Sequence, residues 1–276
     1  MAMHASPRRT HGFTLVEIVI VITLLGIVGA MVAVFMKKPI DAYFDTARRA
    51  ALVDLADTTT RRMAREIRSA LPNSLRVASN QCVEFIPTKA GGRYRAETSS
   101  TGTGDTLDFS TADSSFDVYG DLGALPTAQR PAVGDLVAVY NLGITDSDAY
   151  NLDNVSAITS VTNASPESSI GISPKKFPLA SGSSRFQVIP STDKVVSYAC
   201  SGGKLYRFSN YAYSATSSCQ TPVSSTPVLA TDVASCNFVY NGSDLQRNAL
   251  VQISLVFTRT AESVSLYHEV HVNNTP

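Results

Sequence analysis

The 276-residue sequence lacks the short motifs by which many enzymes are identified. It contains no phosphate-binding loop, no His-Glu-x-x-His and no Gly-x-Ser-x-Gly. Its few histidines include His268 and His271, whose odd separation on a predicted strand places them on opposite faces, where they cannot share a metal ion. We therefore expect no catalytic residue, no cofactor and no metal, and we do not expect an enzyme.

Net charge and closely spaced cysteine pairs are absent as well. The 23 basic residues balance 23 acidic ones, so no overall field draws the molecule to nucleic acid, and no such partner is expected. The 4 cysteines form no Cys-x-x-Cys, which argues against a zinc or redox site. In an oxidising compartment they suit two disulfides. We expect Cys82–Cys200, at the ends of two candidate strands, and Cys219–Cys236; other connectivities and four buried thiols stay open.

Three regions of the chain differ sharply in composition. Residues 1–12 are polar and basic, whereas residues 13–36 are apolar except for Glu17. A helix over these 24 residues spans about 36 Å, enough to cross a bilayer. Arg8 and Arg9 precede it and favour a cytoplasmic N-terminus, so the remaining, polar part of the chain should lie in the periplasm.

A second helical pattern follows the apolar run. Lys37 and Lys38 mark the membrane exit, and an amphipathic helix at 37–72 is expected to continue the first one. Its apolar positions are Phe44, Ala47, Ala51, Leu55, Met63, Ile67 and Leu71, and its other face carries Arg48, Arg49, Arg61, Arg62, Arg65 and Arg68. Asp45–Arg49 and Asp57–Arg61 are favourable four-residue pairs. We interpret the arginine face as solvated, with a partner surface as the alternative.

After Pro72 the apolar period changes to two, as in strands. The candidate strands are Cys82–Ile86, Arg93–Glu97, Thr106–Phe109, Asp135–Tyr140, Arg185–Ile189, Lys194–Cys200, Lys204–Phe208, Leu250–Thr258 and Glu262–Val272. Gly91-Gly92, Gly202-Gly203 and Asn241-Gly242 predict turns, and residues 98–115 and 141–184 predict long surface loops. The expected fold is α+β, with the long N-terminal helix packed on an antiparallel β-sheet domain at 73–276.

The junction of the first two regions reads Gly-Phe-Thr-Leu-Val-Glu at residues 12–17. A secretory signal is cut after its apolar segment, but no clear Ala-x-Ala follows this one. Gly12, a small residue at the membrane boundary, leaves the bond to Phe13 accessible to a membrane peptidase. Glu17 is unusual, because a carboxylate costs about 2.5–3.5 kcal/mol at the centre of a membrane helix and less near its end. The alternative is that Glu17 has no functional role and simply extends its carboxylate to the lipid headgroups.

This junction resembles the N-terminus of the type IV pilin and pseudopilin family. The resemblance implies a pilin-like fold and a leader peptide at 1–12, removed by a prepilin peptidase between Gly12 and Phe13. It also implies N-methylation of Phe13, helices of residues 13–36 packed together in a fibre, and pairing of Glu17 with the amino terminus of a neighbouring subunit. The implied partners are the peptidase, other pilin subunits, the inner-membrane assembly machinery and membrane lipid.

A weaker resemblance extends further along the chain. Residues 63–77, 247–251 and 268–276 are similar to MshO-type minor pilins of the mannose-sensitive haemagglutinin (MSHA) pilus. We therefore expect a minor type IV pilin for pilus assembly or initiation, held in the inner membrane by a single pass and then placed in a fibre at the cell surface. The alternatives are a minor pseudopilin of a type II secretion system and a membrane-anchored adhesin for cell adhesion.

Overall fold

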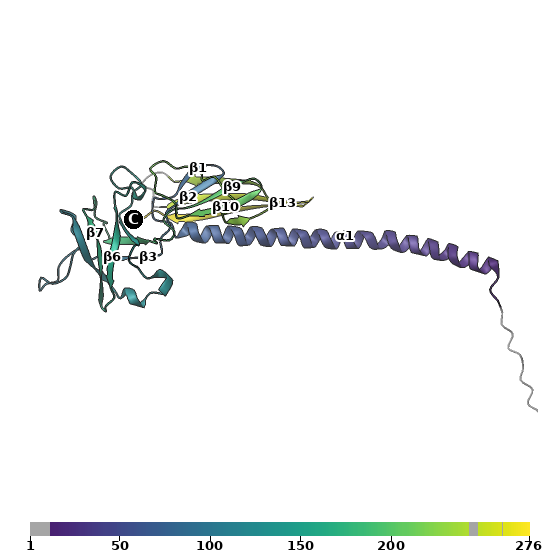
Figure 1. Ribbon diagram of the computed structural model, residues 1–276, viewed down its shortest axis with the longest axis horizontal. Coiled ribbons are helices and arrows are strands. Elements are labelled where there is room, and N and C mark those ends of the chain that lie inside the picture. The colour runs from purple at the N-terminus through teal and green to yellow at the C-terminus, as the bar shows by residue number, and fades with distance from the viewer. Residues whose placement is uncertain (1–11, 243–247, 261) are drawn as a thin grey trace, which may run out of the picture. The chain divides into compact units, whose positions relative to one another are not determined.

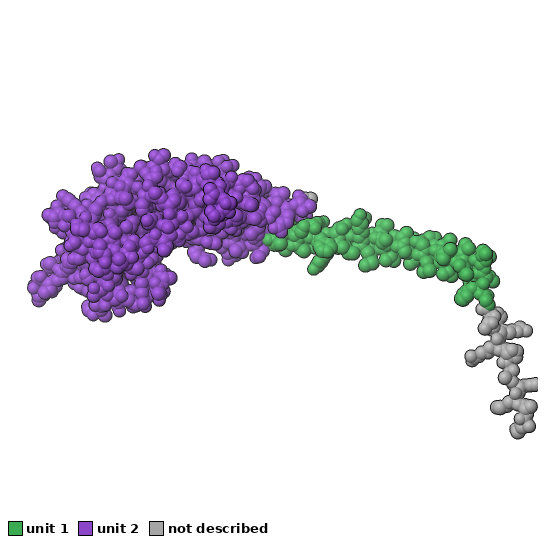
Figure 2. Space-filling model, viewed as in Figure 1, with its two compact units in different colours: residues 1–51 green, residues 52–276 purple. Residues whose placement is uncertain are grey.

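The computed structural model describes residues 12–242, 248–260 and 262–276. It divides the chain into two compact units, residues 1–51 and residues 52–276, which Figure 2 distinguishes by colour. Apart from Gly12, the predicted leader lies outside the described residues. The predicted region boundaries at residues 36 and 72 stay predictions.

Helix α1 (Leu15–Arg68) has 54 residues and contributes to both units (Figure 1). In the first unit its sequence is long and apolar enough to cross a membrane. The side chains of its most apolar stretch are not buried. A helix that is apolar all round suits a lipid or helix-rich environment rather than water.

The part of α1 in the second unit is amphipathic. Its buried side chains recur at three- and four-residue spacing and are Leu52, Ala56, Thr59, Thr60, Met63, Ala64 and Ile67. The helix ends at Arg68, before the predicted end at Pro72, because the backbone then joins the sheet. Ala70 bridges Pro87, and the Leu71 N–H donates to the Ile86 carbonyl at 2.7 Å.

The regular secondary structure in the rest of the described second unit consists of strands and three single-turn 3₁₀-helices. The strands are β1 (Arg76–Ser79), β2 (Cys82–Phe85), β3 (Ala90–Arg93), β4 (Asp113–Tyr119), β5 (Leu136–Val139), β6 (Val155–Thr162), β7 (Glu167–Lys175), β8 (Arg185–Ile189), β9 (Val196–Ser201), β10 (Lys204–Ser209), β11 (Val228–Ala230), β12 (Val233–Asn241), β13 (Asn248–Arg259) and β14 (Glu262–Asn273). The 3₁₀-helices are η1 (Leu122–Ala124), η2 (Thr127–Gln129) and η3 (Ala149–Asn151).

Two antiparallel sheets and α1 make up what we call the head. One sheet has the order β1-β2-β9-β10-β11 and the other β12-β13-β14. Side chains from both sheets and from α1, among them Met63, Phe85, Tyr198 and Phe257, share one buried apolar core. The predicted α+β fold, a long N-terminal helix on antiparallel sheet, is thus confirmed.

The chain between β2 and β9 forms an additional sheet, which we call the insert (residues 89–190). Its strand order is β3-β8-β5-β6-β7-β4. Tyr94, just past β3, bridges Val118 of β4, and the Arg95 N–H donates to the Asp117 carbonyl at 2.8 Å. The two outermost strands therefore meet, and the sheet closes into a barrel. Its interior holds a core separate from that of the head, with Phe116, Ile170 and Phe186 among its members.

The loop predicted at 141–184 is wrong in its middle, where two strands form. Strands β6 and β7 lie inside it, and β4 begins within the other predicted loop at 98–115. Serine, threonine and glycine occupy most outward positions of β6 and β7, so composition suggested a loop. Ile158, Ile170 and Ile172 nevertheless point inward and pack in the core of the insert, while Val155 packs in a smaller apolar cluster together with Leu71 and Ile86.

The predicted glycine turns have mixed outcomes. Gly202-Gly203 forms the turn between β9 and β10, as predicted, with φ values of 56° and 74°. Gly91-Gly92 lies instead within β3, and that turn prediction is wrong. A Cβ atom on Gly92 would stand 2.8 Å from the Phe186 ring, so glycine is needed there for close packing rather than for a turn.

Candidate processing and assembly site

The start of α1 lies directly after the predicted cleavage site. Gly12, Phe13 and Thr14 precede the helix. The backbone carbonyl of Thr14 accepts the Ile18 N–H at 3.2 Å, and the side-chain Oγ1 of Thr14 accepts the Glu17 N–H at 3.3 Å. Thr14 is therefore the N-cap, and the Gly12–Phe13 bond lies outside the helical hydrogen bonds. A peptidase can reach such a bond without unwinding a helix; cleavage there and N-methylation of Phe13 stay predictions.

Glu17 lies in the first turn of α1. At this position the partial positive charge of the helix N-terminus favours a carboxylate. Thr14-x-x-Glu17 also has the sequence pattern of a capping box, a local signal for the helix start that was not among the predictions above. The first turn of α1 thus offers Glu17 a favourable local position, beside the predicted contact with a neighbouring subunit.

The apolar part of α1 offers a smooth surface for helix packing. The Thr23 hydroxyl is satisfied within the helix, at 2.9 Å from the carbonyls of Val19 and Ile20. Gly26 and Gly29 have open space where a Cβ would stand. Small residues and internally satisfied polar groups permit close approach of a second apolar helix.

Opposite charges partly neutralise the arginine face of α1. The predicted pair Asp57–Arg61 is confirmed, with 2.7 Å between Arg61 Nε and Asp57 Oδ2. Asp45 pairs with Arg48 rather than with Arg49, so that prediction is wrong. Both arginines are helical neighbours of Asp45, at three and four residues, and the sequence alone does not decide between them.

The C-terminal part of the arginine face of α1 lines a groove between α1 and β14. Arg61, Arg65 and Arg68 stand on one side, with Tyr267 and His268 on the other. Arg65 and Arg68 are exposed and make no ion pair with any residue that the structure describes. This is the arrangement of a solvated helix face.

The described cysteines form one disulfide, Cys200–Cys236, with Cα atoms 6.4 Å apart. The predicted pairs Cys82–Cys200 and Cys219–Cys236 are therefore wrong. Cys82 stands opposite Ala199, so Cys200, one residue further on, points to the other face of the sheet. That face is the inner one, where Cys236 of β12 packs in the core of the head. Cys82 and Cys219 are thiols, the first buried and the second exposed.

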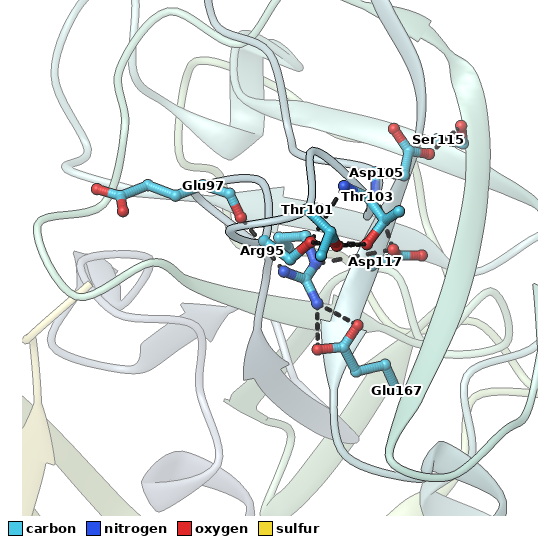
Figure 3. Close-up of polar contacts among 9 residues, drawn as sticks. Arg95, Glu97, Thr101, Thr103, Asp105, Ser115, Asp117 and Glu167 are labelled. Carbon is cyan, nitrogen blue, oxygen red and sulfur yellow. Dashed lines mark hydrogen bonds and ion pairs between the residues drawn. The ribbon is translucent and has the colours of Figure 1, made fainter.

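A polar cluster joins the strands of the insert around Arg95 (Figure 3). The Arg95 guanidinium pairs with Glu167 of β7 and lies 3.8 Å from the Asp117 carboxylate of β4. The Asp105 N–H donates to that carboxylate at 2.8 Å, and the Ser115 hydroxyl donates to the Asp105 side chain at 2.5 Å. The carboxylates of Glu167, Asp117 and Asp105 thus all have donors or cations from the protein itself as partners, and the cluster links strands of the insert to one another. Its members are far apart in the chain, so sequence spacing gave no signal for it.

Comparisons with known proteins add one finding. Neither the curated proteins nor the solved structures give a significant match to the chain. Residues 7–33 match the family model described as "Prokaryotic N-terminal methylation motif". The matched segment contains Gly12, Phe13, Thr14 and Glu17, and it supports a type IV pilin-like protein.

Proposed function

We propose that this chain is a minor type IV pilin of the MSHA type, a structural subunit that takes part in pilus assembly or initiation after processing by a prepilin peptidase. The observation that carries the proposal is the methylation motif at residues 7–33, directly followed by a helix able to cross a membrane. The length of the chain supports the minor-subunit assignment, because MshO-type minor pilins are larger than most major pilins.

Each part of the N-terminal segment has a task in this proposal. Cleavage after Gly12 frees an amine on Phe13 and leaves α1 attached to the mature protein. The apolar half of α1 holds the subunit in the inner membrane and later packs among the helices of other pilin subunits. The amphipathic half belongs to the head, which lies in the periplasm before the assembly machinery places it in a fibre.

Two other functions share these features. A minor pseudopilin of a type II secretion system uses the same N-terminal device. A membrane-anchored adhesin is favoured by the insert, a closed barrel with its own core that the head does not need for its own strand pairing. Deleting the gene separates the three, because it removes pili, removes secretion, or removes adhesion while pili remain.

The processing step is tested by the mass of the membrane-extracted protein. The wild-type chain should lack residues 1–12 and carry one added methyl group on Phe13. Gly12→Glu should retain the leader, because the enlarged, charged side chain blocks the peptidase. An N-terminus generated after the apolar run, or efficient cleavage of the Gly12→Glu variant, would overturn the proposal.

A further inference from the structure

Strand β2 is buried on both faces, although only one of them contacts the core of the head. Val83 and Phe85 point into that core. Cys82 and Glu84 alternate with them and therefore point to the opposite face, yet they are 0% and 2% exposed. Something outside the two sheets must cover this face.

The cover is a segment without regular secondary structure between β10 and β11, residues 210–219, which we call the strap. The Tyr211 hydroxyl donates to Glu84 Oε2 at 2.7 Å. Arg76 of β1, 2.5 Å from the Glu84 carboxylate, donates to the carbonyls of Ser214 and Ala215 at 2.6 and 3.0 Å. The strap is thus fixed along its length by a buried acid and its arginine partner.

The last residue of the strap lies against Cys82. Ser79 is the cross-strand partner of Cys82 in the β1–β2 pair, and its Oγ is 3.4 Å from Cys219 Sγ. The Cys219 thiol is also close enough to the Cys82 thiol to contribute to the raised pKa of Cys82. Cys200 and Cys236 are already joined on the other face of the sheet, so Cys82 and Cys219 are left to one another.

We propose that Cys82 and Cys219 form a second disulfide, which fastens the strap to the β1–β2 hairpin. The two thiols together lose two electrons and two protons. The oxidant is the disulfide of a thiol oxidase of the kind found in oxidising compartments, which becomes a dithiol. The in-cell oxidation rests on the periplasmic location proposed above; the pairing itself rests only on the geometry of the head.

The order of the two steps follows from exposure. Cys219 is exposed, so its thiolate attacks the oxidase disulfide first and forms a mixed disulfide while one oxidase sulfur leaves. The Cys82 thiolate then attacks the Cys219 sulfur and displaces the second oxidase sulfur. Burial raises the pKa of Cys82, and the neighbouring Cys219 and Glu84 raise it further, which makes Cys82 a poor first nucleophile.

Peptide mapping of the full-length protein in detergent tests the link. The protein is reduced, oxidised in a glutathione redox buffer, alkylated and digested without reductant. Cys219 and Cys236 lie on one tryptic peptide, 208–247, so cleavage before Asp232 is needed to separate them. The expected product joins peptide 77–89 to peptide 208–231. Alkylated thiols at both Cys82 and Cys219, or a bond from either one to Cys200 or Cys236, would overturn the proposal.

Two variants keep the test independent of folding. Cys219→Ser changes only an exposed side chain and should leave Cys82 as a slowly alkylated thiol, with Cys200–Cys236 intact. The double variant Ser218→Cys, Cys219→Ser moves the strap thiol by one residue and should lower the linked fraction about tenfold, because the thiol leaves its place beside Ser79, the neighbour of Cys82. Equal linkage in the shifted variant would refute a site-specific pair. The same mapping on protein extracted from cells, without the reduction and reoxidation steps, shows separately whether the bond forms in the compartment where the protein resides.

Discussion

Glu17 combines a local role with a predicted intermolecular one. Its N–H is capped by Thr14, and its charge is favoured by the helix N-terminus. In lipid alone the carboxylate can still reach the headgroups, because it lies near the helix start. Packed helices are drier, and Coulomb attraction to an opposite charge grows as the effective dielectric constant falls. The free amine of Phe13 on a neighbouring subunit would supply that charge at a similar depth.

Glu17→Val should therefore still insert, still fold its head and still be cleaved, but enter fibres poorly. We expect its recovery in sheared pili, relative to the membrane fraction, to fall at least about tenfold, equal to about 1.4 kcal/mol of lost pairing. Thr14→Val is the matched control, since it removes the capping hydroxyl and keeps the carboxylate. Normal recovery of Glu17→Val would reduce Glu17 to a tolerated boundary charge.

Glu66 of α1 links the helix to the sheet through Arg207. Arg207 Nε lies 2.8 Å from Glu66 Oε2, and the same guanidinium is 3.4 Å from Asp193. Burial by itself raises the pKa of Glu66, but hydrogen bonds from Arg207, Tyr198 and Arg62, with the charge of Arg207, together outweigh it and hold the pKa below its usual range. The folded state therefore binds this proton less readily than the unfolded state does.

The stabilisation from Glu66 should be fully present above the unfolded pKa of about 4.3 and be lost as the pH falls below it. Glu66→Gln should flatten the dependence of the unfolding free energy on pH in this acidic range. Arg207→Leu should cost about 2 kcal/mol at neutral pH, because it leaves half-buried Glu66 with only the more exposed Arg62, 3.2 Å away, as an ion-pair partner. Urea unfolding in detergent, followed by near-ultraviolet circular dichroism, measures both; an unchanged acid limb in Glu66→Gln would contradict this assignment.

The cysteine pairs could not be predicted because they depend on the exact register in which two strands pair. The sequence placed Cys82 and Cys200 on strands that are indeed neighbours in the sheet. A shift of one residue in their pairing nevertheless moves a side chain to the other face, and nothing in the local sequence specifies that shift. By contrast, Gly12, Phe13 and Glu17 form a contiguous motif, which needs no tertiary information to recognise.

At the scale of elements, the turn after α1 is held by asparagine side chains. Asn73 has a φ of 57°, and its side-chain amide donates to the Asn141 carbonyl at 2.9 Å. Asn141, fully buried, donates in turn to the Pro72 carbonyl at 2.7 Å. The Asn274 side chain accepts the Asn73 N–H at 3.1 Å. The end of α1 is thus tied to the insert and to the C-terminal segment at one point.

Asn141→Ala should break this junction and lower the unfolding free energy by about 2–3 kcal/mol. The change removes the bond to Pro72 and also the acceptor of the Ala149 N–H at 2.8 Å, so buried polar groups lose their partners. Asn151→Ala, at an exposed position close by, should change the free energy by less than about 0.5 kcal/mol. Equal effects in the two variants would show that the junction is not a point of stability.

The strands differ in how clearly their sequence pattern predicts them. The strands β13 and β14 were predicted because Val251, Ile253, Leu255 and Phe257 alternate with polar residues, and all four are buried as expected. Strands β6 and β7 carry fewer apolar residues and more serine, so their pattern resembled that of a loop. Their pairing is fixed by the closed barrel, which is a property of long-range contacts rather than of local sequence.

At the scale of the whole second unit, the head and the insert have separate cores and share a smaller one. The shared core includes Leu71 and Ile86 from the head with Tyr150 and Ile189 from the insert. The insert leaves and re-enters the head at adjacent points, since the Lys89 N–H donates to the Val188 carbonyl at 2.9 Å. Adjacent ends and a private core are the usual marks of a domain inserted into a host fold.

We therefore expect the insert, about 100 residues long, to fold by itself, and the head to fold without it. Residues 89–190 expressed alone should unfold cooperatively in urea. In the full chain, replacing residues 90–188 by a short Gly-Ser linker should preserve the head and its Cys200–Cys236 bond. That shortened chain should be less stable by a few kcal/mol, because it uncovers Leu71 and Ile86 and loses the Asn141 junction. A non-cooperative insert, or a shortened chain that no longer forms Cys200–Cys236, would show instead that the two cores fold only together.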